Sequence, residues 1–430
     1  MNFRHLSVFL LLIAMLLSSQ PVAQGRTYDR DKAPAPASED VVLQWNRVLT
    51  ETLLVPGQQP PTIAAVRSYA MMHAAIFDAV NSIDGSYKPY LIDVPGTKHA
   101  SIEAAAAKAA RDVLASLYPT RTGIFDAEFA ASIAGLEENR VRQGIRVGEA
   151  VGARIIAVRS NDGWTADRPA YVLPPTPGNW QPTPPANAPA AFTHYPNVIP
   201  FALESGSQFM PPPPPPLTSA EYTRAFNEAK ELGAMNSPTR TADQTEQALA
   251  WASVGNPTAI PIVWNRIASS LAVSQGNTTV ENARMFALMN ISNHDGFQTA
   301  FASKFHYGLW RPVTAIRRAD EDDNPNTAPD SNWSPLIGTP PYPTYAGNMA
   351  TIGWSNAAVL ALFFGRDDLA LQYTFPTGAN RSYASLSAMA EEGGRSRIYG
   401  GIHFEFDSVA GRSIGINTSN YVFLNYMTPR

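Results

Sequence analysis

Two cations in an apolar stretch are the first residues of this chain that suggest chemistry. Lys304 and Arg311 lie seven residues apart, with mostly aromatic and apolar residues between them. If the stretch is one helix, both side chains share a face, and Pro312 ends the helix so that Arg311 lies in its last turn. Burying two such cations is costly unless an anion neutralises them. The pattern therefore predicts an anion site, and the alternative is a pair of surface cations with buried stems.

A second group of polar residues follows near the C-terminus. His403 and Asp407 are four residues apart, which predicts that they share one face of a helix. A carboxylate beside an imidazole fixes its tautomer and raises the basicity of the opposite nitrogen. Arg397, which lies across the Gly400-Gly401 pair, can approach the same point. A lone His–Asp pair is usually structural, but the nearby arginine favours a chemical role.

A third segment lies between these two and precedes an apolar helix predicted over 350–364. It reads Pro-Pro-Tyr-Pro-Thr-Tyr-Ala and then continues with Gly347, Asn348 and Met349. Gly and Asn at a helix start leave free backbone N–H groups at the positive end of the helix dipole. Such a start is common to most helices, so it predicts an anion seat only in combination with the other two segments.

The first and last segments carry a resemblance to a known family. Lys304-x₆-Arg311-Pro312 and Ser396-Arg397-x₅-His403-x₃-Asp407 resemble signature segments of the vanadium haloperoxidase and type 2 phosphatidic acid phosphatase superfamily. The phrases HYGLWRPVTAIR and RSRIYGGIHFEFD are similar to its soluble bacterial haloperoxidase-like branch. The likeness extends from Val41 to the end of the chain, including the Arg67–Asn81 segment and short segments at Trp180, Phe209 and Glu246.

The resemblance implies an all-α helical bundle with an oxyanion pocket for vanadate, which phosphate can also occupy. In the family, the His at the His403 position binds vanadium or attacks phosphorus, and the carboxylate at the Asp407 position orients it. The residues at Lys304, Arg311 and Arg397 neutralise the oxygens, and Gly347 and Asn348 border the pocket. Three cations with backbone N–H groups can balance the charge of a tetrahedral oxyanion.

The middle segment departs from the family, which usually has Pro-Ser-Gly-His there. Without a gap, Gly347 takes the Ser position and Met349 the His position; with one residue deleted, Ala346 and Asn348 take them. Both alignments lose the acid/base His, and neither Asn nor Met exchanges a proton near neutral pH. General acid–base help is worth about 10²–10⁴-fold. We therefore expect a phosphatase to be impaired and peroxide activation, with Lys304 as a catalytic residue, to survive in part, unless His306 substitutes.

The N-terminus reads as an export signal. Arg4 and His5 precede an apolar run over 6–17 that is too short to span a bilayer, and small or polar residues follow. We expect a signal peptide over residues 1–25 and a secreted or periplasmic protein that has no membrane contact after signal removal. An uncleaved anchor or a buried first helix is the alternative.

The rest of the chain must position these segments. We expect an N-terminal helical region over residues 26–217 with a Pro-rich crossover, and a helical bundle with the anion site over 218–430. Apolar periodicity predicts helices over 41–90, 101–118, 127–133, 141–159, 221–232, 241–251 and 279–301. Prolines are frequent over 169–217, which predicts an ordered, extended crossover, or alternatively a linker between two domains.

Composition excludes several other functions. The net charge is −4, which argues against nucleic acid as a partner, and the absence of cysteine excludes thiolate chemistry. His73 is expected in the core, and His294-Asp295 either structural or near the site. The acidic run Asp320–Asp323 favours a solvated turn over a calcium site, because the calcium-loop spacing is missing.

The sequence thus predicts an exported vanadium-dependent haloperoxidase-like enzyme that oxidises halide with hydrogen peroxide at a vanadate bound by His403. One alternative is an acid phosphatase that cleaves a phosphate ester with His403 as nucleophile. Another is a non-catalytic oxyanion-binding relative, because the middle segment lacks its Ser and His. The oligomeric state stays open.

Overall fold

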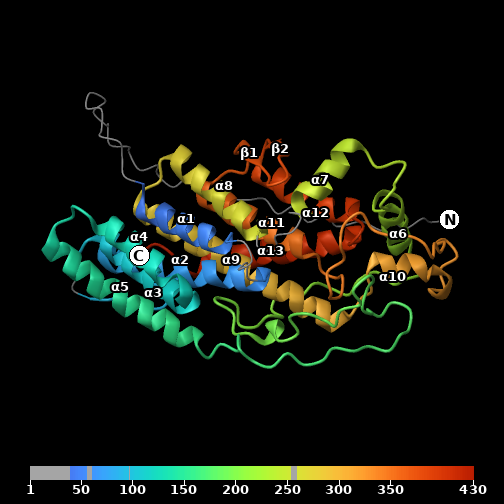
Figure 1. Cartoon of the computed structure of the whole chain (residues 1–430), viewed down its shortest axis with the longest axis horizontal. Helices are drawn as coiled ribbons and strands as arrows, with labels where there is room; N and C mark the ends of the chain where they lie inside the picture. Colours follow the sequence, from blue (N-terminus) through green and yellow to red (C-terminus); the bar gives the residue numbers. More distant parts are fainter. Residues whose placement is uncertain (1–38, 56–60, 96, 253–258) are drawn as a thin grey trace, which may run out of the picture. The chain divides into compact units, whose positions relative to one another are not determined.

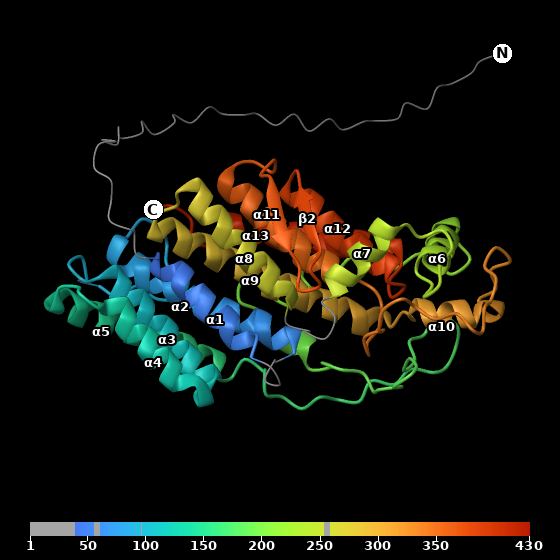
Figure 2. The ribbon, with the colours of Figure 1, turned by 45° about the horizontal axis from the view of Figure 1, so that its top comes forward.

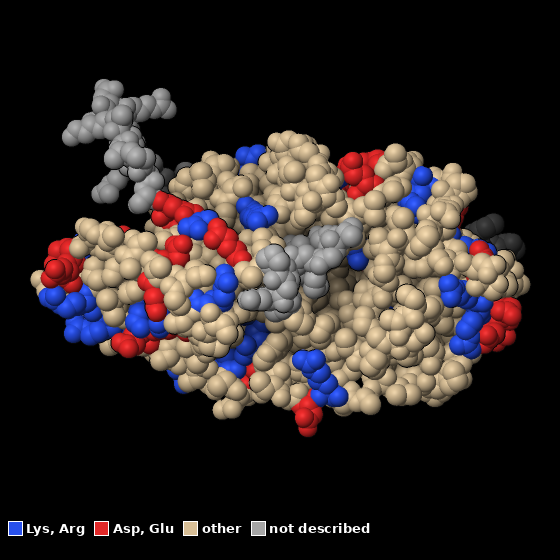
Figure 3. Space-filling model, in the orientation of Figure 1, with Lys and Arg blue, Asp and Glu red and all other residues tan. Residues whose placement is uncertain are grey.

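Helices with buried apolar faces make up most of the structure, as the sequence predicts for an all-α protein. The structure is a computed structural model that describes residues 39–55, 61–95, 97–252 and 259–430. The predicted signal segment lies outside these residues. Among the described residues, no helix is long and apolar enough to cross a membrane. On the face shown in Figure 3, acidic and basic side chains are interspersed on a mostly uncharged surface.

The N-terminal helices confirm the predicted ones with small shifts at their ends. They are α1 (Val41–Leu53), α2 (Thr62–Asp84), α3 (Ile102–Leu117), α4 (Thr122–Ile133) and α5 (Glu138–Arg159), with a 3₁₀ turn over Pro119–Arg121. Helices α3 and α5 pack closely because glycines face α3. A Cβ at Gly148 would lie 2.4 Å from the carbonyl oxygen of Ala105, so a larger residue would force the two helices apart.

The Pro-rich crossover is extended and packs on the helical body, as predicted. In Figures 1 and 2 it runs as a long coil beneath the bundle. Its regular structure within 169–217 is a 3₁₀ turn over Tyr195–Asn197, and Trp180 and Tyr195 are fully buried. Tyr307 and Tyr345 donate hydrogen bonds of 2.7 Å to the carbonyl oxygens of Pro211 and Pro212, respectively. These bonds fix the crossover against the segments that carry the site.

The C-terminal helices include several that the sequence reading missed. They are α6 (Ala220–Leu232), α7 (Ala242–Ala252), α8 (Ala259–Gln275), α9 (Thr279–Tyr307), α10 (Pro312–Arg317), α11 (Asn348–Phe364), α12 (Leu386–Tyr399) and α13 (Glu405–Asn425), with a 3₁₀ turn over Ala319–Glu321. Helices α8, α10 and α12 were not predicted. A short antiparallel hairpin of β1 (Leu371–Thr374) and β2 (Asn380–Tyr383), in which Leu371 pairs with Tyr383, was also not predicted.

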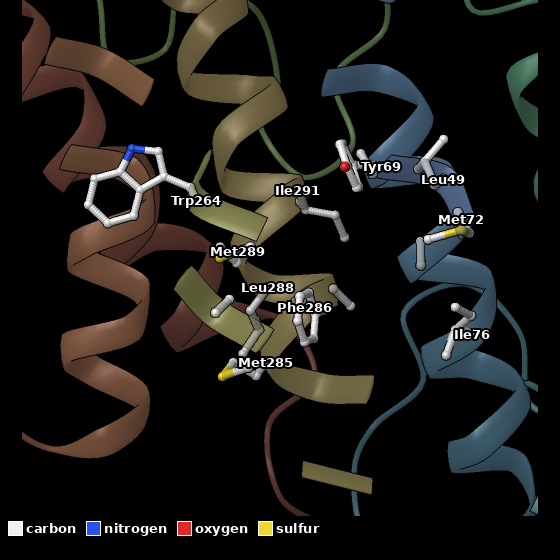
Figure 4. Close-up of a cluster of buried hydrophobic side chains, with 14 of the residues drawn as sticks. Leu49, Tyr69, Met72, Ile76, Trp264, Met285, Phe286, Leu288, Met289 and Ile291 are labelled. Atoms are coloured by element: carbon white, nitrogen blue, oxygen red, sulfur yellow. The ribbon is translucent and has the colours of Figure 1, made fainter. Parts of the chain in front are cut away.

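Helix α9 is the central element of the bundle. Its side chains are buried continuously from Asn282 to Lys304, and it contacts α2 on one side and α11 and α13 on the other. Figure 4 shows Phe286 and Ile291 of α9 among side chains of the neighbouring helices, including Met72 of α2. Its buried residues are apolar ones such as Phe286 and Ile291 together with polar ones such as Asn290 and Asp295. The core thus fixes the position of Lys304 near the end of α9.

Glycines bring α11 and α13 together at the site. A Cβ at Gly411 would lie 2.4 Å from the carbonyl oxygen of Gly347, and one at Gly415 would lie 2.8 Å from the backbone nitrogen of Ser355. A side chain at either position would separate the helices. The close approach aligns the start of α11 with the start of α13.

Candidate oxyanion-binding site

Lys304 and Arg311 come together, but not on one helix as predicted. Helix α9 ends at Tyr307, and Gly308 follows with a φ of 61°, which favours glycine at a helix C-terminus. Arg311 has an extended backbone, and Pro312 begins α10 instead of ending a helix. The prediction was wrong because proline is favoured in the first turn of a helix, where its missing N–H is not needed.

His403 and Asp407 form the predicted pair, although His403 lies in the loop before α13. The Nδ1 atom of His403 is 2.8 Å from Oδ2 of Asp407. Asp407 lies in the first turn of α13, and its Oδ2 also accepts a hydrogen bond of 3.0 Å from the backbone N–H of Phe404. The carboxylate therefore caps the helix and holds the imidazole at the same time.

The two buried cations are held by backbone carbonyl groups of the middle segment and its neighbours. Lys304 Nζ donates to the carbonyl oxygen of Thr344 at 2.7 Å and to that of Ala346. Arg311 Nε donates to the carbonyl oxygen of Tyr342 at 2.8 Å, and Nη1 donates to that of Ile402 at 2.7 Å. These contacts position the cations but do not neutralise them, because carbonyl groups carry no net charge.

Arg397 joins this group from the last turn of α12. The residue is half-buried as a whole, but its Nη1 is buried without a hydrogen-bond partner among the described residues, as is Nη2 of Arg311. Arg395 fixes this end of α12, since its guanidinium pairs with Glu405 and lies 2.5 Å from Glu228. Unpaired buried N–H groups are rare and costly in proteins.

The electrostatics confirm an excess of positive charge. Burial lowers the pKa of Arg311 and of Arg397 to about 10. Burial and the neighbouring Arg311 hold the pKa of Lys304 well below its usual value. Burial raises the pKa of Asp407 to about 6, against its hydrogen bonds and nearby cations. One carboxylate faces three cations, so a bound anion would relieve the imbalance.

His403 is a neutral imidazole whose Nε2 accepts a hydrogen bond. Arg311 Nη1 lies 3.2 Å from Nε2 of His403, and a guanidinium can only donate, so Nε2 must be the acceptor. Nδ1 therefore carries the proton and donates to Asp407. Burial, with Arg311, Lys304 and Arg397 adding to it, holds the pKa of His403 well below its usual value. The lone pair of Nε2 thus points toward the positive groups.

In the middle segment, Asn348 and not Met349 takes the first position of α11. Met349 is buried toward α12, where its Cγ would lie 3.6 Å from a Cβ at Gly393. Asn348 is the first residue of α11, and its Oδ1 is buried without a partner in the described part of the chain. Gly347 donates its backbone N–H to the carbonyl oxygen of Asp407 at 2.8 Å. The sequence predicted that this N–H group would be free to bind an anion, but it is paired within the protein.

His306 does not reach this group. Its side chain is exposed in the last turn of α9, with its ring 4.6 Å from that of Tyr307, whereas Lys304 is fully buried. Residues two apart on a helix point to different sides. The hypothesis that His306 replaces the missing His is therefore wrong.

The remaining candidates are structural. Asp295 is fully buried and accepts backbone N–H bonds from residues 201–203, and Nδ1 of His294 lies 2.9 Å from its Oδ1. His73 is buried against Asn46, as expected for a core residue. Asp322 caps a turn through Asn324 and Thr327. Within the described ranges, no group of three His, Asp or Glu residues is arranged to hold a metal ion.

Two site residues were missed by the sequence reading. The ring of Tyr342 lies 5.5 Å from Lys304 Nζ and 5.1 Å from the Arg311 guanidinium carbon. The hydroxyl of Thr344 reaches both His403 and Asp407. Thr344 could have been singled out from the sequence, because it is the one residue with an aliphatic hydroxyl group in its short Pro- and Tyr-rich segment.

Known proteins are similar to this chain in sequence and in fold. Residues 284–429 match the family model described as the VCPO second helical-bundle domain. The vanadium chloroperoxidase of Curvularia inaequalis is 26% identical over 262 residues, which cover 47% of this chain and 42% of that protein. The matched part thus spans less than half of that relative.

Two solved structures extend the comparison to most of the chain. A structure described as the first bacterial vanadium-dependent iodoperoxidase has a TM-score of 0.79 at 21% identity and covers 92% of this chain and 99% of its own. A holo-type bacterial vanadium-dependent chloroperoxidase has a TM-score of 0.67 at 16% identity, covering 84% and 91%. At these identities they establish the shared fold. Together with the family match over residues 284–429, they bear out the predicted resemblance to the vanadium haloperoxidases.

Proposed function

We propose that this chain is an exported, vanadium-dependent haloperoxidase-like enzyme that uses hydrogen peroxide to oxidise a halide. The observation that carries the proposal is the charge imbalance around His403. His403 Nε2 accepts from Arg311, and two other buried guanidinium N–H groups, on Arg311 and Arg397, have no partner among the described residues. A small oxyanion can accept from both of these N–H groups at once.

The residues fit vanadate, and phosphate by the same geometry. His403 would hold the metal through Nε2, while Lys304, Arg311 and Arg397 would hold the oxygens. Bound vanadate supplies Lewis acidity that activates hydrogen peroxide toward a nucleophile. The protein's own contribution is to fix the His403 tautomer through Asp407 and to keep the cations away from water. Lys304 and Arg311 are 0% exposed and His403 is 4% exposed, which strengthens their interaction with an anion.

The residue at the start of α11 favours peroxide chemistry over phosphate ester cleavage. Asn348 cannot protonate a leaving alcohol near neutral pH. A phosphatase with His403 as nucleophile would therefore be restricted to activated aryl esters, which need no acid. Oxidation of halide does not release an alcohol, so it depends less on this missing group.

The first experiment is a titration of purified protein with orthovanadate, followed by ⁵¹V NMR and calorimetry. We expect saturable binding that is lost in His403→Ala and retained in His194→Gln, a buried histidine outside the site. Turnover is then measured with peroxide, an indicator dye and either bromide or iodide. Absence of vanadate binding in the wild type would overturn the proposal.

Other outcomes identify the alternatives. Binding of vanadate and phosphate without any turnover would identify a non-catalytic oxyanion-binding protein. Hydrolysis of aryl phosphates without halide oxidation would identify a phosphatase. In that case Asn348→His should raise the hydrolysis of alkyl esters by about 10²-fold, since it restores an acid.

The proposal of export rests on the predicted signal segment alone. N-terminal sequencing of protein produced with the full chain should find a mature N-terminus near residue 26. An intact Met1 on protein recovered from the cell interior would contradict export.

A further inference from the structure

Thr344 contacts both halves of the candidate site. Its hydroxyl oxygen lies 2.5 Å from Oδ2 of Asp407 and 3.1 Å from Nδ1 of His403. Its carbonyl oxygen accepts the hydrogen bond of 2.7 Å from Lys304 Nζ. The residue is fully buried, so water does not compete for these contacts. One residue outside the signature positions of the chain thus joins α9 to α13.

We propose that Thr344 is a positioning residue, whose hydroxyl keeps His403 in the Nδ1–H tautomer and whose carbonyl group keeps Lys304 apart from Asp407. The proposal rests on the proposed function only in what it says about anion binding. Its statement about the tautomer concerns the protein without any ligand.

The direction of the Thr344 proton agrees with the tautomer that Arg311 requires. The Thr344 hydroxyl has a single proton, which it can give either to Asp407 or to His403. Donation to Nδ1 would force the His403 proton onto Nε2, which would then face the donor Nη1 of Arg311 at 3.2 Å. Donation to the carboxylate avoids this clash and gives the shorter contact, and hydrogen bonds to carboxylates are the stronger ones.

The hydroxyl also completes the set of donors around Oδ2 of Asp407. That oxygen accepts from Thr344, from His403 Nδ1 at 2.8 Å and from the Phe404 N–H at 3.0 Å. With three donors, Oδ2 is held in place in front of His403. Loss of the hydroxyl would leave it free to rotate toward another donor.

Lys304 is the cation that would compete for this carboxylate. The two groups interact electrostatically, yet the contacts of Lys304 Nζ in the described structure are with the carbonyl groups of Thr344 and Ala346. A direct ion pair would neutralise Lys304 and turn Asp407 away from His403. Thr344 prevents this, because it gives each charged group a separate partner.

Valine is the matched substitution because it keeps the shape of threonine and removes only the hydroxyl. We expect Thr344→Val to weaken binding of orthovanadate and of inorganic phosphate by about 10–100-fold, the usual cost of losing an outer partner of a metal ligand. Thr344→Ser retains the hydroxyl and should bind close to the wild type. Thr299→Val removes a buried hydroxyl on α9, which bonds the carbonyl of Asp295, and should leave affinity unchanged.

NMR of the ligand-free protein labelled with ¹⁵N-histidine tests the tautomer directly. We expect His403 to show a protonated Nδ1 in the wild type and in Thr344→Ser, and a mixture of tautomers in Thr344→Val. An unchanged Nδ1–H tautomer together with unchanged affinity in Thr344→Val would overturn the inference, as would equal losses of affinity in Thr344→Val and Thr299→Val.

The two proposals fail in different ways. If the wild type binds neither anion, the proposed function falls, and the tautomer shift still decides the role of Thr344. If the wild type binds both anions and Thr344→Val binds them equally well with the same tautomer, only the inference about Thr344 falls.

Discussion

Two groups of buried cations in this protein differ in how their charge is satisfied. In the N-terminal part, Arg67 forms an ion pair of 2.8 Å with Asp162 and also donates to the carbonyl oxygen of Arg159. Arg159 donates to Ile199 at 2.8 Å and lies 3.6 Å over the ring of Phe201. At the site, Lys304 and Arg311 bond only to carbonyl groups and His403 among the described residues, and one guanidinium nitrogen each of Arg311 and Arg397 lacks a partner there.

The difference shows which buried cations indicate a binding site. A buried arginine with a carboxylate and carbonyl partners is complete, and removing it harms the fold. A group of buried cations with unpaired N–H groups lowers the stability of the ligand-free protein, which favours the interpretation that the group binds an anion. Burial alone does not separate the two groups; the pairing does.

The largest expected effect is at the complete group. Arg67→Met leaves Asp162 buried with its closest remaining cation, Arg159, 3.9 Å away. We expect a loss of about 3–5 kcal/mol in the free energy of unfolding, because an uncompensated buried charge remains. Arg311→Met should cost less, since it relieves repulsion with the neighbouring cations. Urea denaturation measures both, and an equal loss in the two variants would contradict the comparison.

The second prediction concerns stabilisation by an anion. Phosphate at about 100 times its Kd should raise the free energy of unfolding by about 2.7 kcal/mol, because it binds only the folded site. The increment should disappear in Arg397→Met and persist in Arg67→Met, even though the latter is less stable. Thermal melts with and without phosphate provide the measurement. Loss of the increment in both variants would mean that it reflects general salt effects.

The third prediction concerns the pH dependence of stability that His73, a buried histidine of the N-terminal part, should cause. His73 donates from Nε2 to Oδ1 of Asn46 at 3.0 Å, because the Asn46 amide nitrogen already donates to Asn265. Burial lowers the pKa of His73 to about 3, well below the value of about 6.5 in an unfolded chain. The unfolded state therefore binds a proton that the folded state does not bind between these two pH values.

It follows that stability falls as the pH decreases from about 6.5 toward 3, by about 1.4 kcal/mol per pH unit from this residue. His73→Gln keeps a donor for Asn46 and should remove this part of the slope. Urea denaturation of both proteins at pH 7, 6 and 5 measures the difference. Parallel stability curves would show that His73 is protonated in the folded protein.

The smallest expected effect concerns the hydrogen bonds that Tyr307 and Tyr345 donate to the Pro-rich crossover. Tyr345→Phe and Tyr307→Phe each remove one hydrogen bond to the Pro-rich crossover and should cost about 1 kcal/mol of stability. The stabilisation by phosphate should remain in both variants, since the cations are unaffected. A loss of phosphate binding would show that the crossover, and not the cation group alone, maintains the site.

The sequence predicted the helical class and most helix positions because apolar periodicity and capping residues are local signals. Ser101 caps α3 and Thr278 caps α9 as their residue types favour. Helices α8, α10 and α12 and the β1–β2 hairpin were missed. Proline at position 261 obscured α8, and the hairpin is too short to show a clear alternation.

The sequence by itself determined which residues form the site, because Lys304, Arg311, Arg397, His403 and Asp407 are polar residues of special types at recognisable spacings. It did not determine how they meet. Arg311 and His403 lie on loops, and their positions depend on backbone carbonyl and N–H groups contributed by distant segments. The contacts of Thr344 and the exclusion of His306 likewise follow only from the tertiary structure. Side-chain type is written in the sequence, whereas the partner of each charge is decided by packing of helices far apart along the chain.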